Sequence, residues 1–497
     1  MNNLKNKFVK SVLWVASAKF VGQAFSWLVT IILIRLLSPK DFGIVAMVSA
    51  YHAIIVIFYD LSLGQALIQK KDLKPREIQT VLWAVPVAGA LLYAFSFIFA
   101  PYVAAFFKNE QIAMVLRVYT IGIIFQSAQE VPYCLLSKQF DFDKRAKAEF
   151  ISNVISMLVS LILAYLEYGV WSLVFGFLAK TFSQAILIFY FFEWKSILTP
   201  KQPLTFSCTD LYALLKFSLP LTGFYSLRFL FMRSDSVIVG RWLGDKSLGY
   251  YSVALDLARM PVDKFITILN QVCFPLFAEL QDDLEALQTY FFKILKFVAL
   301  IVFPISIGAA ILSKEMVYLI LTPKWSPIIN PFICLCFVAI LQSLAGIIFM
   351  LINALGKSRI NFVFSLISAI LLPISFLITV RYGLLAVAMS WVVVYTPLFL
   401  YLIHLTNSQI DSSFRRFAMA IKSPLFAVLS MALSVSGLKM IIGLDIISFQ
   451  TMFLYIFVGA TTYITYIYLF SPQTIGEIKG IYFDLRSSRD SRCELAS

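Results

Sequence analysis

The sequence predicts an all-α, polytopic membrane protein with about 14 transmembrane helices, and three observations support this fold class. Of the 497 residues, 60% are hydrophobic and only 14% are charged, whereas about a quarter are charged in soluble domains. The apolar residues form runs of about 20 or more, which is the length that crosses a bilayer core as a helix. The charged residues collect between these runs. A transmembrane β-barrel is excluded because its strands are about ten residues long and alternate apolar with polar positions.

The apolar runs, bounded by charged residues, Pro or Gly, define the expected helices in order. They cover residues 11–37, 42–63, 78–107, 112–136, 146–167, 169–193, 212–243, 248–278, 289–313, 326–354, 357–380, 383–406, 418–441 and 445–470. The first run follows a basic segment and is too long for a signal-peptide core, so we expect it to be retained. An even number of crossings places both termini on one side of the membrane.

The distribution of Lys and Arg between loops predicts the orientation. Loops on the side of the N-terminus, with the C-terminal tail, carry 24 of these residues, and the opposite loops carry 10. Positively charged loops are retained in the cytoplasm, so we expect both termini to be cytoplasmic. The net charge of +14 follows from this topology. Nucleic acid is not expected as a partner, because the basic residues are not concentrated in one soluble domain.

A short internal repeat predicts two lobes. When residues 31–50 are aligned with residues 237–256, identical residues occur at Arg35 and Arg241, Leu37 and Leu243, Lys40 and Lys246, and Gly43 and Gly249. The two segments fall at equivalent places, the ends of the first and seventh helices, which favours two six-helix lobes in the same orientation. The expected organisation is an N-lobe at 1–193, a cytoplasmic linker at 194–211, a C-lobe at 212–406, two extra helices at 407–470 and a cytoplasmic tail at 471–497.

Several ionisable residues fall inside the expected helices. Such groups cost a few kcal/mol each in a membrane and persist mainly where they face a partner or a watery cavity. Basic residues outnumber nearby acids, and unpaired cations in a cavity suit a phosphate or diphosphate group. The expected substrate-binding cations are Lys19, Lys180, Arg228, Arg233 and Arg259. The candidates for ion coupling are Asp235, Asp256 and Glu130. An alternative stays open for Asp235 and Asp256, which could simply join helices through buried ion pairs.

Other kinds of site are not expected. The only two histidines, His52 and His404, lie in different lobes, so neither a metal site nor a His-based catalytic group can be assembled. The sequence has no Gly-rich phosphate loop and no soluble domain large enough for ATP hydrolysis. We therefore expect no cofactor, no metal and no catalytic residues.

Four segments resemble a known family. Residues 233–244 (RSDSVIVGRWLG) and 248–254 (LGYYSVA) resemble the helix 7 to helix 8 signature of Wzx-type polysaccharide flippases similar to the colanic acid exporter. Residues 35–43 (RLLSPKDFG) and 63–69 (LGQALIQ) are similar to the turn between helices 1 and 2 and to the end of helix 2 in that family. The resemblance extends over most of the chain.

The resemblance implies membership of the multidrug, oligosaccharidyl-lipid and polysaccharide exporter superfamily, whose two lobes enclose a cavity and exchange inward-open and outward-open states. It implies a flippase that moves undecaprenyl-diphosphate-linked oligosaccharide from the cytoplasmic to the periplasmic leaflet for O-antigen, capsule or exopolysaccharide synthesis. The head group would lie among the lumen cations and the polyprenyl tail in lipid. The implied partners are this lipid-linked oligosaccharide and membrane lipids, with a polysaccharide polymerase as a further candidate.

Two alternative functions were weighed against this one. A membrane-embedded glycan polymerase or transferase would handle the same lipid carrier, but an enzyme acting outside usually needs a sizeable periplasmic loop, and every expected outward loop is short. A multidrug antiporter of the same superfamily would prefer acids in its cavity, which the surplus of basic residues opposes. We therefore expect a transporter and not an enzyme.

Overall fold

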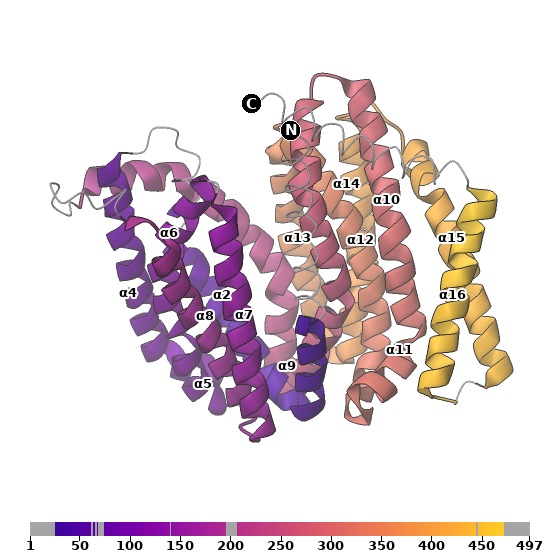
Figure 1. Ribbon diagram of the computed structural model, residues 1–497, viewed down its shortest axis with the longest axis horizontal. Coiled ribbons are helices and arrows are strands. Elements are labelled where there is room, and N and C mark those ends of the chain that lie inside the picture. Colours follow the sequence, from indigo (N-terminus) through magenta and orange to yellow (C-terminus); the bar gives the residue numbers. More distant parts are fainter. Residues whose placement is uncertain are drawn as a thin grey trace, which may run out of the picture. The chain divides into compact units, whose positions relative to one another are not determined.

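The computed structural model describes residues 25–60, 63, 64, 67, 74–139, 141–194, 206–443 and 446–471, and all regular structure in these ranges is helical (Figure 1). Eleven helices in this part of the chain are long and apolar enough to cross a membrane. The predicted class, an all-α polytopic membrane protein, is confirmed at this level. The eleven spans correspond to the predicted helices from 42–63 to 169–193 and from 289–313 to 445–470.

The chain divides into two compact units, Met1–Gly249 and Tyr250–Ser497. The first unit contains a short apolar helix, Phe25–Leu36, and a group of longer helices packed around a shared core. Val81 and Val85 of α4, Ile123 of α6 and Ile188 of α8 are buried together in this core. The helices of the unit are α2 (Pro39–Asp60), α4 (Pro75–Phe107), α5 (Gln111–Tyr119), α6 (Gly122–Lys138), α7 (Phe142–Tyr165), α8 (Val170–Phe191) and the first part of α9 (Cys208–Glu279).

One local departure from the predicted helices occurs in this unit. The predicted helix at 112–136 is interrupted between α5 and α6, around Thr120. The element α9 comprises two helices that meet at Gly244, where the predicted helices at 212–243 and 248–278 are separated. The φ angle of Gly244 is 84°, a backbone conformation that glycine adopts most readily. The charged residues of α9 make it less apolar than the eleven candidate spans.

The second unit continues from α9 into ten further elements. Most of α12 is buried among its neighbours, whereas most of α16 is exposed, as expected of a helix that faces lipid. Helices α15 and α16 pack against each other (Figure 1). The elements are α10 (Leu284–Ile311), α11 (Ser313–Glu315), η2 (Met316–Leu321), η3 (Pro323–Ile328), α12 (Ile329–Ala354), α13 (Ser358–Thr379), η4 (Val380–Tyr382), α14 (Leu384–Asn407), α15 (Phe414–Ile442) and α16 (Phe449–Phe470).

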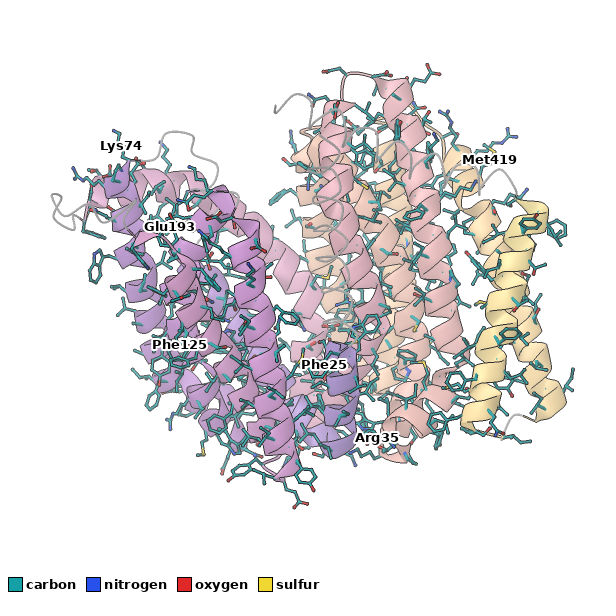
Figure 2. The ribbon with its side chains drawn as sticks, viewed as in Figure 1. Phe25, Arg35, Lys74, Phe125, Glu193 and Met419 are labelled. Atoms are coloured by element: carbon teal, nitrogen blue, oxygen red, sulfur yellow. The ribbon has the colours of Figure 1, made fainter. Side chains whose placement is uncertain are left out.

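Successive loops are predicted to lie on opposite sides of the membrane, and this can be examined within the first unit. Figure 2 shows Lys74 and Glu193 at one end of this unit and Arg35 at the opposite end. The sequence assigns Lys74 to the cytoplasmic side and Arg35 to the outward side, which is consistent with this arrangement. The predicted boundaries of lobes, linker, extra helices and tail stay predictions.

Candidate functional site

The predicted site residues are distributed over both units. Lys180, Arg233, Asp235 and Glu130 belong to the first unit, and Arg259 and Asp256 belong to the second. Lys19 and the side chain of Arg228 lie outside the described residues. The chamber that these groups are expected to share stays a prediction.

Arg259 has the most informative surroundings of the predicted cations. It lies on α9, and its side chain is partly buried. The guanidinium carbon is 5.8 Å from the centroid of the Trp391 ring. One terminal nitrogen, Nη2, is buried and has no hydrogen-bond partner among the described residues. A buried guanidinium nitrogen without an acceptor is costly, and an incoming anion would satisfy it.

The ring beside Arg259 belongs to Trp391, and Tyr251 holds it in place. Neither residue was predicted as part of the site. Trp391 of α14 is fully buried, and its Nε1 donates a hydrogen bond to the hydroxyl of Tyr251 on α9 at 2.9 Å. Tyr251 is fully buried as well. The sequence contains a usable signal for this pair, because a Trp in the middle of an apolar helix requires an acceptor for its N–H. The signal does not say which residue supplies that acceptor.

The charged residues near position 235 differ widely in exposure. Arg233 is exposed, whereas Asp235 is fully buried. The Oδ1 atom of Asp235 accepts hydrogen bonds from the backbone N–H of Ser236 at 2.6 Å and from its hydroxyl at 3.2 Å. Lys180 on α8 is partly buried and has interaction partners. Complete burial of Asp235 suits the alternative role of joining structural elements. Its role in ion coupling stays a prediction.

Two polar contacts involve α6 in the first unit, one within the helix and one with α2. The predicted coupling residue Glu130 accepts a hydrogen bond from the Cys134 thiol at 3.2 Å. One turn earlier on α6, Gln126 Oε1 lies 3.1 Å from Nε2 of His52. The imidazole ring meets Tyr119 and Phe177 edge to face, with ring centroids 5.2 and 5.3 Å apart. The pairing of His52 with Gln126 could not be predicted from the sequence, because the two residues are far apart in the chain.

One ion pair in the second unit is almost completely buried. Lys439 Nζ lies 2.7 Å from Oε1 of Glu315, and the two side chains are 12% and 4% exposed. The ammonium also donates to the carbonyl oxygen of Ile311 at 2.7 Å. Lys439 is one of the ten Lys and Arg residues that the sequence assigns to the outward side. Its structural role is to connect α15 to the segment that follows α10.

The fold and these groups define a multi-pass membrane protein in which ionisable side chains are held inside helical units. The sequence profile of the family described as "Polysaccharide biosynthesis protein" matches residues 32–330. The chain therefore belongs to this family, and the predicted family is confirmed. It is a family of transporters and not of enzymes.

The chain is also similar in sequence to curated proteins and in fold to a solved structure. The chain is 24% identical over 496 residues to an uncharacterized membrane protein in the cps region of Klebsiella pneumoniae, covering 97% of this chain and 99% of that protein. It is 24% identical over 369 residues to the lipopolysaccharide biosynthesis protein WzxC of Escherichia coli (strain K12), covering 74% of each. Its fold is similar to that of the lipid II flippase MurJ in an inward closed conformation, with a TM-score of 0.74, 17% identity, and coverage of 92% of this chain and 99% of that one.

Proposed function

We propose that this protein is a flippase for undecaprenyl-diphosphate-linked oligosaccharides. It would move these units from the cytoplasmic to the periplasmic leaflet of the bacterial inner membrane, with both of its termini in the cytoplasm. The units would serve the synthesis of a surface polysaccharide of the O-antigen, capsule or exopolysaccharide type. Transport would proceed by alternating access, driven by an ion gradient or by the substrate gradient. The family match and the names of the relatives support the substrate class.

The observation that supports this proposal most directly is the buried Nη2 atom of Arg259, which has no acceptor among the described residues. A guanidinium inside a membrane protein is retained mainly where it meets a partner or a polar path. In the described part of the chain, Nη2 of Arg259 is buried and lacks a protein acceptor. Arginine binds phosphate oxygens through charge-assisted hydrogen bonds. A diphosphate linked to a lipid is the anion that a polysaccharide biosynthesis transporter would meet at this depth.

The test uses a bacterial strain whose surface polysaccharide depends on the protein. We expect the substitution Arg259→Ala to slow export about ten- to hundredfold, because loss of a charge-assisted hydrogen bond to a charged ligand corresponds to about 1.5–3 kcal/mol. Lipid-linked oligosaccharide should accumulate on the cytoplasmic side. Surface polysaccharide and extracted lipid-linked intermediates are measured together, with membrane levels of each variant checked by immunoblot.

The matched control is Arg359→Ala, which removes an exposed guanidinium near the start of α13. Its export should remain normal. Normal export by a fully expressed Arg259→Ala protein would contradict the proposed role of this residue. A null strain with intact polysaccharide but increased sensitivity to cationic drugs would instead support the multidrug antiporter and overturn the flippase proposal.

A further inference from the structure

Two arginines in the described part of the chain combine an adjacent aromatic ring with a buried, unpartnered guanidinium nitrogen. Arg241 lies over Phe106, with 5.3 Å between the guanidinium carbon and the ring centroid, and Arg259 lies over Trp391 at 5.8 Å. Arg241 precedes the kink at Gly244, at the end of a predicted span, where a long side chain can reach the membrane surface. Arg259 lies beyond this kink, in the second unit and inside the next predicted span. The two similar contacts therefore occupy different environments.

The ring beside Arg259 is held in one orientation. Trp391 is fully buried and donates its Nε1–H to the hydroxyl of Tyr251 at 2.9 Å. Phe376 of α13 and Tyr395 of α14 pack against the indole, with ring-centroid distances of 5.3 and 5.9 Å. An indole that is packed on its sides and satisfied at its N–H cannot rotate freely. The position of the guanidinium beside it is consequently restricted as well.

We infer that Trp391 and Tyr251 are positioning residues for Arg259. The hydroxyl of Tyr251 fixes the indole of Trp391 through a hydrogen bond. The indole in turn orients the guanidinium of Arg259 through a cation–π contact. In this orientation, Nη2 of Arg259 can donate a hydrogen bond to a phosphate oxygen of the substrate. This inference rests on the proposed function, because it assigns the anion to the diphosphate of a lipid carrier. It adds two residues that would not touch the substrate themselves.

The chemistry of the three side chains explains why this arrangement suits a binding site. A buried guanidinium nitrogen that lacks an acceptor destabilises the unoccupied protein, so packing alone would favour an apolar side chain at position 259. A bound phosphate oxygen supplies the missing acceptor in a charge-assisted hydrogen bond. The planar guanidinium can rest against an aromatic ring while its edge remains available, which a lysine ammonium cannot reproduce. A carboxylate of an acidic sugar offers similar oxyanion chemistry, so the test must separate the two sources.

The experiment measures equilibrium binding of radiolabelled undecaprenyl diphosphate to the purified full-length protein in lipid nanodiscs. Undecaprenol, which has no phosphate, and glucuronic acid, which has only a carboxylate, are used as competitors. We expect Trp391→Leu to weaken binding on the order of tenfold, because the cation–π contact and the fixed position of Arg259 are both lost. Trp391→Phe and Tyr251→Phe should weaken it only a few-fold, since an aromatic ring remains beside the guanidinium. Undecaprenyl diphosphate should compete, whereas undecaprenol and glucuronic acid should not.

A double-substitution cycle distinguishes positioning from simple structural damage. In the Arg259→Ala background, Trp391→Leu should cause no further loss of binding, because the group that Trp391 positions is absent. The matched control is Phe106→Leu, which removes the ring beside Arg241 and should leave binding unchanged. Thermal unfolding of every variant identifies a protein that has lost its fold, and Trp391→Phe keeps the cycle usable if Trp391→Leu is such a protein.

Each outcome has one meaning. If wild-type protein does not bind undecaprenyl diphosphate, the proposed function and this inference are both overturned. If wild-type protein binds, Arg259→Ala loses binding and Trp391→Leu and Trp391→Phe retain full affinity, the positioning role alone is overturned. An equal loss from the Trp391 substitution with and without Arg259 also overturns it. Displacement of the radiolabelled undecaprenyl diphosphate by glucuronic acid would show that the site accepts a carboxylate and overturn the assignment to phosphate.

Discussion

Gly43 of α2 and Gly249 of α9 lie against each other within the first unit, and their contacts are reciprocal. A Cβ atom built on Gly43 would overlap the carbonyl oxygen of Asp245 and lie 3.0 Å from the N atom of Gly249. A Cβ atom built on Gly249 would overlap the carbonyl oxygen of Pro39 and lie 3.1 Å from the N atom of Gly43. Gly43 and Gly249 are equivalent in the internal repeat, and so are Pro39 and Asp245. Residues at equivalent positions of the sequence repeat therefore exchange equivalent contacts, whereas the two-lobe organisation stays a prediction.

Because the backbones approach closely at these glycines, adding one methyl group should lower the stability of the protein substantially. We expect Gly43→Ala and Gly249→Ala each to destabilise the protein by about 1–3 kcal/mol, because the added Cβ meets backbone atoms that cannot move aside like a side chain. Thermal unfolding of the purified protein in detergent measures the change. The control is Gly223→Ala in α9, where no atom of the described residues outside the local helix lies within 4 Å of the added Cβ. Unchanged unfolding temperatures for both contact variants would contradict the observed packing.

The kink of α9 predicts a backbone effect that does not depend on packing. Gly244 has a φ angle of 84° and no atom within 4 Å of a built Cβ, so Gly244→Ala adds strain without a steric clash. We expect a loss of about 1–3 kcal/mol in stability, since this region of backbone conformation is strongly unfavourable for alanine. The matched control is Gly437→Ala in α15, which also has open space but no positive φ. It should be neutral or slightly stabilising. Equal unfolding temperatures for the two variants would argue against the kink.

The sequence was sufficient to predict the helices that consist of long apolar runs. Eleven predicted spans correspond to helices in the structure because their length and apolar character follow directly from the thickness of the membrane. Gly and charged residues interrupt the apolar run after residue 243, and the backbone leaves the helical region at Gly244 in the structure. The pattern of hydropathy located this break between two helices. It did not show that the break is a single non-helical residue.

The candidate site was only partly accessible to sequence reasoning. Arg259 could be identified from the sequence, because a guanidinium in an apolar segment costs free energy in a membrane and is retained mainly for a specific role. The pairing of Trp391 with Tyr251 could not be predicted, because it depends on how α9 and α14 pack. The same reason applies to His52 and Gln126, which come together across α2 and α6. A local pattern can show that a Trp needs an acceptor, but it does not show which residue supplies one.

The buried pair formed by Lys439 and Glu315 predicts how firmly α15 is attached to the second unit. Removing one partner leaves an uncompensated charge in a place where the remaining side chain is nearly inaccessible to water. We therefore expect Lys439→Ala and Glu315→Ala each to destabilise the protein by about 3–5 kcal/mol. The measurement is thermal unfolding in detergent, together with limited proteolysis of the connection between α14 and α15, which should become faster.

The matched control for this pair is Lys147→Ala, which breaks the ion pair between Lys147 and Asp143, whose side chains are 60% and 70% exposed. An exposed pair contributes about 0–1 kcal/mol, so its loss should be hard to detect. The double variant Lys439→Met with Glu315→Leu should recover much of the lost stability, because apolar side chains of similar size often replace a buried ion pair without cost. If the double variant is as unstable as the single ones, the pair matters for more than the neutralisation of its own charges. Its hydrogen bond to Ile311 would then be the contact that secures α15.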